Sequence, residues 1–597
     1  MRSLKKNVMS NTIKIHPKDN LIVAINDLKK GENVTVDEKT ISIQVPVKQK
    51  HKFAQSDIEK GEPLLMYGVK VGVANQKILK GTPLTTENMD NAFNENIHYE
   101  NVGKLNFKKS KNSDRFFMGY PRKDGSVGTQ NVWLFFPLVF CENRNIELLK
   151  TIFEKEFYPD KLHEHQQFLR NLVQNKEETT TEVKQINPFP NVDVRFITHH
   201  SGCGGTRSDS KMLGKLLSGY VNNPNVVGAT VLSLGCQNLQ VELFLEELKS
   251  MNPRFDKPLL LFDQQKIGNG EDLIKKIIKD SVEGIKKANE VKREKTPLSK
   301  LTVGLECGGS DGFSGISANP TLGAAMDKLV ADGGSAILSE FPELRGVEQE
   351  LVDRCVDIKK AKKFIDLMQR YEQKVIESGT DFSTNPSPGN IKDGLITDAM
   401  KSAGAAKKGG ISPVVDVLDY GEYLQNSGLN LLCTPGNDVE STTAMAGSGA
   451  NLIVFTTGLG TPTGNPITPV IKISSNTTVF NKMSDIIDFN SFEKGKKINS
   501  INKGSVTENA KLITFHKSKP LLPIIENLMV KSDNLTAELL IKTIGFESNK
   551  KEGNWKNGLE EVRTFIHDSV GIDTANFSIQ DGSGVSRYNY GSPSQYI

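Results

Sequence analysis

Short apolar runs alternate with longer amphipathic stretches over about residues 116–490. The runs that have the length of buried strands are 132–139, 231–234, 259–262, 301–305, 429–433 and 452–455. The stretches 272–291 and 348–378 place apolar residues at helical spacing. This alternation predicts an α/β fold, in which a mostly parallel, Rossmann-like sheet region carries helices on both faces.

A different pattern occupies residues 11–90. A unit that reads apolar, any residue, Lys, Gly, two residues, apolar begins at Leu28, Ile58 and Ile78. Short alternating runs lie between these units, so we expect a small β module that turns at its glycines. The polar residues 91–115 that follow predict a linker.

Composition narrows the function classes. The chain has 597 residues, enough for three or four domains, and a net charge of +4 whose basic residues are dispersed, which argues against a nucleic-acid partner. No apolar stretch approaches the length of a membrane span. Six cysteines in so long a chain do not form the pattern of a disulfide framework, so we expect a cytoplasmic protein.

Three cysteines lie in glycine-rich turns. They are Cys203 in Gly-Cys-Gly-Gly, Cys236 in Gly-Cys-Gln and Cys307 in Glu-Cys-Gly-Gly-Ser-Asp-Gly. Glycine permits left-handed backbone angles and a close approach to a ligand. Such turns are therefore typical of a thiolate that faces a metal or a substrate, although free cysteines are also common as small buried fillers.

Several blocks of the chain, in order, resemble the altronate and galactarate dehydratase family. They are 119–122, 124–131, 201–204, 234–236, 304–323, 385–390, 434–438, 455–458 and 472–474. The resemblance covers about residues 11–490 and is nearer to the altronate branch. It implies an N-terminal SAF (β-clip) domain at 11–90, a linker at 91–115, a second domain at 116–300 and a C-terminal α/β catalytic domain at 301–490.

The resemblance implies a metal-dependent hydro-lyase that converts D-altronate to 2-dehydro-3-deoxy-D-gluconate, with galactarate as the alternative substrate and a homodimer as the assembly. Removing the weakly acidic proton beside a carboxylate creates an enediolate, and a divalent metal that holds the carboxylate stabilises it. The family implies Fe²⁺ or Mn²⁺. One alternative is a mononuclear ion among His and carboxylate ligands, and the other is an iron–sulfur cluster on three thiolates. The candidate metal ligands are Cys203, Cys236, Cys307, Asp438 and His16.

Other polar residues of the matched blocks are candidates for catalysis and substrate binding. The catalytic candidates are His200, Asp311 and Lys472, and the substrate-binding candidates are Arg122, Asp124, Asn437 and Ser310. An arginine binds a carboxylate with two parallel hydrogen bonds. Each candidate also has a structural interpretation, such as a surface cation for Arg122 or a helix cap for Asp311.

The chain departs from the family in two places. The family carries His-x-His-Asn at the end of the front domain, where this chain has Thr85 and Glu87 in place of the histidines. The tail, 491–597, instead resembles a fragment of a penicillin-binding D-Ala-D-Ala carboxypeptidase, on 532–534, 553–555 and 581–589. It contains no Lys-Thr-Gly block, so we expect an inert α+β fragment. Two further hypotheses are a cell-wall role of the tail, which predicts acylation by β-lactams, and an inactive fusion.

Overall fold

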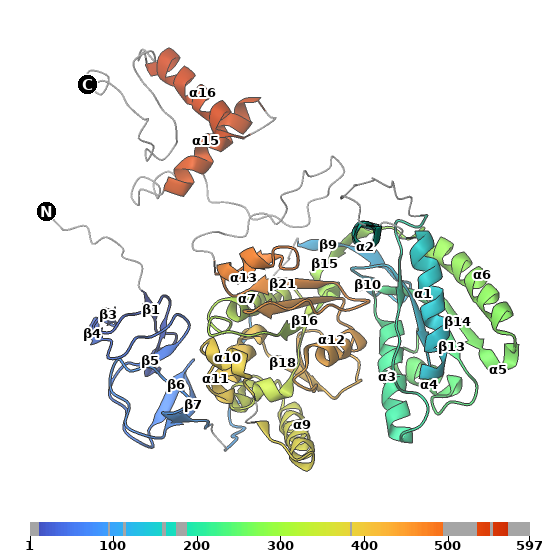
Figure 1. The fold of residues 1–597 in the computed structure, drawn as a ribbon, viewed down its shortest axis with the longest axis horizontal. Coiled ribbons are helices and arrows are strands. Elements are labelled where there is room, and N and C mark those ends of the chain that lie inside the picture. The colour runs from blue at the N-terminus through green and yellow to red at the C-terminus, as the bar shows by residue number, and fades with distance from the viewer. Residues whose placement is uncertain are drawn as a thin grey trace. The chain divides into compact units, whose positions relative to one another are not determined.

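The computed structural model describes residues 11–92, 96–110, 115–157, 163–174, 188–382, 385–492, 534–549 and 553–570. The chain divides into two compact units, Met1–Ile513 and Thr514–Ile597, and each is described by itself. Figure 1 traces both from blue to red. Among the described residues, no helix is long and apolar enough to cross a membrane.

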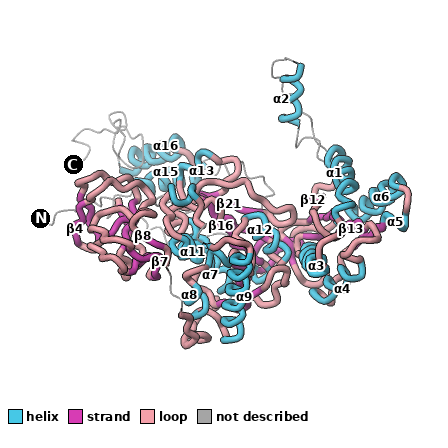
Figure 2. Tube along the Cα trace, turned by 60° about the horizontal axis from the view of Figure 1, so that its bottom comes forward, coloured by secondary structure: helices cyan, strands magenta, loops and turns pink. Residues whose placement is uncertain are grey.

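The front of the first unit is built of short antiparallel strands. They are β1 (Thr12–Ile13), β2 (Leu21–Ala24), β3 (Asn33–Val36), β4 (Lys39–Ser42), β5 (Lys52–Ala54), β6 (Pro63–Met66), β7 (Val69–Ala74) and β8 (Met89–Asp90). Figure 2 shows this module as strand and loop. The predicted β module is therefore present.

The repeated unit of the sequence explains how this module turns. Gly31, Gly61 and Gly81 all have positive φ, between 79° and 89°, as a turn of this kind requires. The apolar residues that flank each glycine are buried. Ile58 and Ile78, which open two copies of the unit, form a β-bridge with each other. The repeat thus places one glycine turn and two core residues in each copy.

A four-stranded parallel sheet forms the next region. Its order is β12 (Asp193–Phe196), β11 (Val132–Pro137), β13 (Val226–Ser233) and β14 (Leu259–Asp263). Its helices are α1 (Asn143–Phe157), α2 (His163–Gln174), α3 (Arg207–Asn222), α4 (Val241–Met251), α5 (Gln264–Ile267) and α6 (Gly270–Ala288). Every residue of β11 is buried, because alternate side chains enter two separate hydrophobic cores.

A seven-stranded parallel sheet follows. Its order is β18 (Val414–Leu418), β19 (Leu429–Leu432), β17 (Ser335–Leu338), β16 (Thr302–Cys307), β20 (Leu452–Thr457), β21 (Val470–Ser474) and β22 (Phe489–Asn490). Its helices include α7 (Ala318–Ala331), α8 (Glu348–Asp353), α9 (Ile358–Glu377), α10 (Pro388–Lys392), α11 (Asp398–Ala405), α12 (Asp438–Gly447) and α13 (Thr477–Lys482). The predicted parallel α/β region is thus built as two sheets.

Alternate residues of the central strands pack on opposite faces of this larger sheet. Leu338 joins the core that contains α7, α9 and α11, whereas Ile337 joins the core that contains α12. Successive side chains of a strand point to opposite faces of the sheet, and both faces are buried here. These strands are therefore continuous apolar runs in the sequence. The helix predicted over 348–378 is divided into α8 and α9, because the Asp357 side chain caps α9 by accepting the Lys360 amide at 2.9 Å.

A small antiparallel sheet and an extended segment join these regions. The sheet is β10 (Val127–Gly128), β9 (Phe116–Pro121) and β15 (Glu294–Pro297). The described part of the predicted linker lies along the seven-stranded region: the His98 amide donates to Gln349, Gly103 to Cys355 and Ser110 to Ala331. The linker is therefore bonded to the domain that it precedes.

The described part of the second unit consists of α15 (Asn534–Asn549), α16 (Trp555–Phe565) and the π-helical turn Ile566–Val570. Gly545 and Gly558 let the two helices approach closely. The Trp555 indole donates to Glu538 at 2.6 Å, and Lys542 lies 4.0 Å from the Trp555 ring centre. Ser532, Asp533 and 581–589, which carried part of the resemblance, lie outside the described residues. The described part of this unit contains helices and no strand, so it does not test the expected α+β fold.

Candidate active site

Two ionisable side chains are buried at the carboxyl end of β16. The Oε2 atom of Glu306 accepts the Ser441 hydroxyl at 2.5 Å, and Oε1 accepts the Cys307 amide at 3.1 Å. Burial raises the pKa of Glu306 to about 7 and that of the Cys307 thiol to about 12. The surroundings therefore disfavour the charged form of both groups.

Glu340, which follows β17, lies beside this pair with an unusual backbone conformation. Its φ of 61° is in the left-handed region, which a residue other than glycine adopts only at a cost. Its buried Oε2 atom accepts no hydrogen bond from a surrounding amide, hydroxyl or amine, and Lys408 Nζ is 3.8 Å away. Its carboxyl group instead shares a hydrogen bond with the carboxyl group of Glu306. Burial and the neighbouring Glu306 raise the pKa of Glu340 well above its ordinary value. The fold thus favours the protonated form of Glu340, which donates a hydrogen bond to Glu306.

Two lysines fix the charge of the adjacent Glu343. Lys401 Nζ lies 2.8 Å from Glu343 Oε1, and Lys408 Nζ lies 2.8 Å from the Cys307 sulfur, which in turn is 3.1 Å from Glu343 Oε2. Although burial opposes the charge of Glu343, the two lysines lower its pKa to about 2. Glu343 is therefore a permanent anion, and it keeps both lysines protonated.

Asp438 approaches the same group from the first turn of α12. The Asn437 side chain caps this helix by accepting the amides of Val439 and Glu440. A Cβ atom on Gly308 would stand only 2.3 Å from an Asp438 oxygen, so this close approach requires glycine. Burial and the charge of Glu343 raise the pKa of Asp438.

These side chains form two overlapping groups of possible metal ligands. Atoms of Glu306, Glu340 and Asp438 lie within 4.8 Å of one another, and so do atoms of Cys307, Glu340 and Glu343. The first group offers only carboxylate oxygens, which suit hard divalent ions. The residues present therefore fit a mononuclear divalent ion. We name Glu306, Glu340 and Asp438 the carboxylate centre.

Its place in the sheet agrees with the general rule for α/β folds. The chain leaves β16 toward β17 on one side and leaves β20 toward β21 on the other, so the strand order reverses between β16 and β20. Ligands of open α/β sheets bind outside the carboxyl ends of the strands at this reversal. The carboxylate centre lies at this edge.

Asp311, a predicted catalytic residue, lies at the same edge but is fully bonded. Its Oδ1 atom accepts hydrogen bonds from Phe313, Ser314 and Ser475, and its Oδ2 atom accepts one from Asn476. Lys50 of the front module lies 3.0 Å from Oδ2. Five contacts on one buried carboxylate favour a structural role, in which Asp311 ties the loop after β16 to the front module. Ser310 is buried in the same loop, and its backbone carbonyl accepts a hydrogen bond from the side-chain amide of Asn390.

Lys472, the second catalytic candidate, lies on β21. Its amine donates to the Thr463 carbonyl and is 4.5 Å from the Phe455 ring centre. Burial lowers the pKa of Lys472, whereas the charge of Asp438 acts against this change. An amine of lowered pKa beside the carboxylate centre is available to move a proton.

Arg122 and Asp124, the predicted substrate ligands, are held by the protein itself. The Arg122 guanidinium donates to the carbonyls of Pro224 and Gln130 and to the Asn131 side chain, at 2.8 to 3.0 Å. Asp124 accepts from Ser126 and Asn252. These contacts favour a structural role for both residues in place of substrate binding, because the polar atoms that would hold a ligand already have partners.

The remaining candidates lie in three places. His16 accepts the Lys18 amide within the front module, and Asn437 is occupied as a helix cap. His200, Cys203 and Cys236 are exposed on loops of the four-stranded sheet. Cys307 belongs to the other sheet, and its sulfur already contacts Lys408 and Glu343, an arrangement that favours a mononuclear ion over a cluster on Cys203, Cys236 and Cys307.

The sequence analysis did not identify several residues in and around the carboxylate centre. They are Glu306, Glu340, Glu343, Lys401 and Lys408. Glu306 directly precedes Cys307 at the end of an apolar run, which is a signal for a residue at a strand's carboxyl end. Glu340 likewise follows the apolar stretch of β17. Nothing in the local sequence marks Lys408, whose partners are distant along the chain.

The positions that differ from the family motif lie at the end of the front module. Thr85 and Glu87 are both exposed, and the Glu87 amide donates to the Thr85 hydroxyl at 3.3 Å within a short turn. Neither side chain joins the groups of possible metal ligands found among the described residues.

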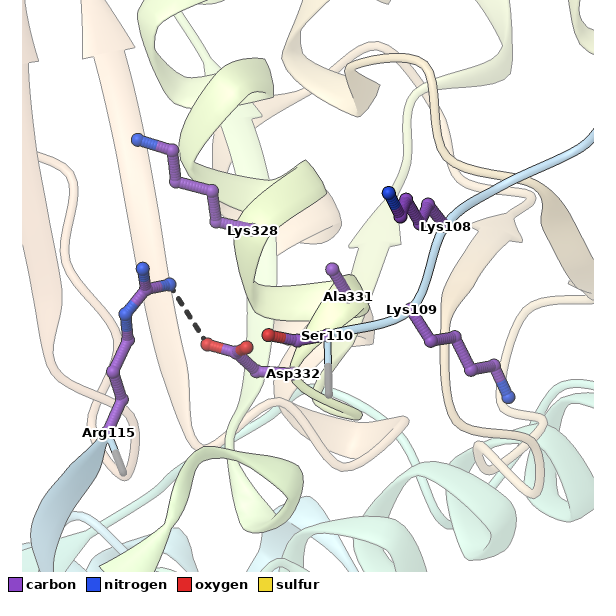
Figure 3. A pocket seen from close by; sticks show the side chains of 7 residues that line it. All are labelled: Lys108, Lys109, Ser110, Arg115, Lys328, Ala331 and Asp332. Atoms are coloured by element: carbon purple, nitrogen blue, oxygen red, sulfur yellow. Dashed lines mark hydrogen bonds and ion pairs between the residues drawn. The ribbon is translucent and has the colours of Figure 1, made fainter. Parts of the chain in front are cut away.

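A cavity of about 420 Å³ with several basic side chains lies between the linker and α7 (Figure 3). It is lined by Lys108, Lys109, Ser110, Arg115, Lys328, Ala331 and Asp332. Arg115 forms an ion pair with Asp332 at 3.0 Å. Lys328 lies in the last turn of α7, where a cation is favoured by the helix dipole. These contacts account for Arg115 and Lys328 without a ligand.

Comparison with known proteins shows that this chain is a hydro-lyase of the sugar-acid dehydratases. Family models match in order: altronate/galactarate dehydratase SAF domain over 10–92, the second domain of D-galactarate dehydratase/altronate hydrolase over 119–289, and the D-galactarate/altronate dehydratase C-terminal domain over 298–508. The chain belongs to the altronate/galactarate dehydratase family.

Two relatives illustrate this similarity. The chain is 35% identical over 482 residues to an altronate dehydratase of Bacillus subtilis, which covers 81% of this chain and 90% of the relative. It is 30% identical over 485 residues to the galactarate dehydratase (L-threo-forming) of Escherichia coli, covering 80% and 87%. The protein is therefore a sugar-acid dehydratase, as the sequence predicted.

The tail has a separate similarity. It is 33% identical over 86 residues to a D-alanyl-D-alanine carboxypeptidase of Haemophilus influenzae, which covers 14% of this chain but only 18% of that relative. The predicted resemblance of the tail to a carboxypeptidase fragment is confirmed.

Proposed function

We propose that this dehydratase converts D-altronate to 2-dehydro-3-deoxy-D-gluconate and that it requires Fe²⁺ or Mn²⁺. The higher identity to altronate dehydratase than to galactarate dehydratase supports altronate as the substrate. Galactarate is the alternative. The reaction removes the proton beside the carboxylate, expels the neighbouring hydroxyl as water, and leaves an enol that becomes the 2-keto acid.

Glu306, Glu340 and Asp438 would hold the metal ion. The single observation that carries this assignment is the convergence of three carboxyl groups, each with an oxygen within 4.8 Å of the others. Burial and mutual repulsion disfavour the ionised form of these three carboxyl groups, and a divalent cation would allow them to ionise together. When bound, the ion would polarise the substrate carboxylate and stabilise the charge that develops beside it.

The lysines around the centre have different tasks. Lys401 and Lys408 keep Glu343 ionised and hold it in place, so that this carboxylate does not titrate near neutral pH. Lys472 is buried and has a lowered pKa, and we assign it the transfer of the substrate proton. The glycine at 308 leaves room for Asp438 and the substrate at the same edge.

The test is anaerobic turnover by the full chain, loaded with Fe²⁺ or Mn²⁺, of D-altronate and of galactarate in parallel, read as 2-keto-3-deoxy acid. We expect altronate turnover, and loss of both turnover and bound metal in Glu340→Gln. The control is Glu377→Gln, which alters an exposed glutamate of α9. Metal-loaded, folded protein that turns over neither substrate would overturn the assignment of function. Unchanged metal binding by Glu340→Gln would overturn the assignment of ligands alone.

We also propose that the enzyme is a cytoplasmic homodimer. The six cysteines are all free, which suits a reducing compartment. Mass determination in solution checks the assembly, and fractionation of the producing cells checks the compartment.

A further inference from the structure

A cavity opens at the carboxyl edge of the four-stranded sheet, in a different sheet from the carboxylate centre. The chain leaves β11 toward β12 and leaves β13 toward β14, in opposite directions, so the strand order reverses between β11 and β13. The lining includes Cys141 and Glu142, which follow β11, Leu234, which follows β13, and Gln264, which follows β14. Ligands of open α/β sheets bind at such a reversal. The cavity volume of about 590 Å³ lies within the range of roughly 300–1,000 Å³ that small-molecule sites occupy.

Three polar side chains of the lining are joined by hydrogen bonds. Glu142 is only 2% exposed, and its Oε2 atom accepts a hydrogen bond from the side-chain amide of Asn145 at 2.7 Å. The same amide nitrogen donates to Gln264 Oε1 at 3.0 Å. In the described part of the chain, the Oε1 atom of Glu142 receives no hydrogen bond. One oxygen of an almost fully buried carboxyl group is therefore left for a ligand in this cavity.

The surroundings of Glu142 favour a hydrogen-bond donor from outside the protein. Burial and the charge of the neighbouring Asp263 raise the pKa of Glu142, and the hydrogen bond from Asn145 acts against this change. A carboxyl group whose charge is disfavoured in this way gains from a further donor, such as a ligand hydroxyl. The proposed dehydration does not use Glu142, because its chemistry takes place in the seven-stranded region.

Two cations and an apolar surface complete the lining. Arg144 lies in the first turn of α1, is exposed, and forms no ion pair within the described residues. The start of a helix favours an anion, and an arginine can bind a carboxylate with two parallel hydrogen bonds. Lys275 lies 3.4 Å from Glu271, but both side chains of this pair are exposed and accessible to a ligand. Leu148 and Ile274 supply apolar contact.

We propose that this cavity binds a small polyhydroxy carboxylate, a sugar acid of the class that the enzyme processes, at a site separate from the carboxylate centre. The ligand carboxylate pairs with Arg144 and Lys275, and a ligand hydroxyl donates to Glu142 Oε1. The choice of a sugar acid rests on the proposed function, whereas the lining itself specifies an anionic group, a hydrogen-bond donor and a short carbon chain. Such a site senses the sugar acid without consuming it.

The test reads the alkylation rate of Cys141 in the full chain, residue by residue, by mass spectrometry. The probes are the product 2-dehydro-3-deoxy-D-gluconate, given to the metal-loaded chain, and D-altronate, given to Glu340→Gln. We expect either compound to slow alkylation of Cys141 severalfold and to leave Cys203 unchanged, because Cys203 is exposed but lies outside the lining. The arm that protects Cys141 at the lower concentration identifies which of the two sugar acids the site prefers.

Variants of the lining test the assigned contacts. Arg144→Met and Glu142→Gln should each raise the ligand concentration needed for protection by about tenfold, the loss typical of a hydrogen bond to a charged group. The matched control is Glu147→Gln, an exposed position of α1 outside the lining, which should keep full protection. Arg144 is exposed, so its variant retains the fold even if Glu142→Gln does not.

Three results would contradict the proposal. Cys141 could be alkylated at the same rate with and without both sugar acids, both variants could keep full protection, or L-serine could protect Cys141 where neither sugar acid does. Failure of the proposed function is recognised separately, because alkylation is read without turnover. A chain that turns over neither altronate nor galactarate but protects Cys141 would still bind a sugar acid at this cavity.

Discussion

Lys50 of the front module and Asp311 of the seven-stranded region form an ion pair at 3.0 Å, and the Asp311 side chain is completely buried. The pair joins two segments that are far apart in the sequence. The neighbouring Lys52, also buried, donates to the Gly394 carbonyl at 2.6 Å. The front module is thus bonded to the loop that leads from Cys307.

Removing this ion pair should destabilise the first unit. In Lys50→Met the buried Asp311 loses the ion pair with Lys50 but keeps four hydrogen-bond donors, so we expect a loss of about 1–3 kcal/mol in the free energy of unfolding. The control is Lys77→Met, because the Lys77–Glu59 pair is exposed and such pairs contribute about 0–1 kcal/mol. Denaturant unfolding compares the two variants. Equal midpoints would show that the Lys50 pair is dispensable.

Gly308→Ala should damage the carboxylate centre without altering a polar group. The new Cβ would fall 2.3 Å from the Asp438 carboxylate, so that side chain must move. We expect bound metal and turnover to fall together. Gly464→Ala, which meets no atom within 4 Å, is the matched control. Normal metal content in Gly308→Ala would place Asp438 outside the centre.

Lys472→Met should separate chemistry from metal binding. A general base contributes about 10²–10⁴-fold to a rate, so we expect kcat to fall in that range while bound metal is retained. Lys482→Met, an exposed position at the end of α13, serves as the control. A variant that keeps its kcat would remove Lys472 from the proton transfer.

Asp398 should make stability depend on pH. Burial raises its pKa to about 8, and its Oδ2 atom has no hydrogen-bond partner. The folded state therefore binds a proton that the unfolded state releases near pH 4, so stability declines as pH rises from about 4 to 8 and then levels off. Asp398→Asn should be more stable than the unsubstituted chain at pH 8, and this advantage should vanish near pH 4.

The opposite sign is expected at Asp357, the cap of α9. Hydrogen bonds from Lys360 lower its pKa, so its contribution is present at neutral pH and is lost on acidification. Asp357→Asn should be less stable than the unsubstituted chain at pH 7 and equal to it at low pH. Unfolding midpoints across pH check both aspartates, and parallel curves for the two variants would contradict the assigned signs.

The sequence alone determined the parts of this protein that depend on local patterns. Apolar runs such as that of β11 identify strands buried on both faces, and the repeat at Leu28, Ile58 and Ile78 identifies a module that turns at glycines. The ordered motifs identify the family. These predictions agree with the structure because hydrophobic period, glycine position and motif are each determined by residues that are close together in the sequence.

Only the tertiary structure decided which of the polar residues meet. Glu306, Glu340 and Asp438 come from three separate segments, and their convergence depends on the strand order of the seven-stranded sheet. The same strand order separates Cys307 from the exposed Cys203 and Cys236, which the sequence presents as equivalent. Arg122 has the residue type of a substrate ligand, but its neighbours in space occupy it. Burial and distance between remote segments, not residue type, assign these roles.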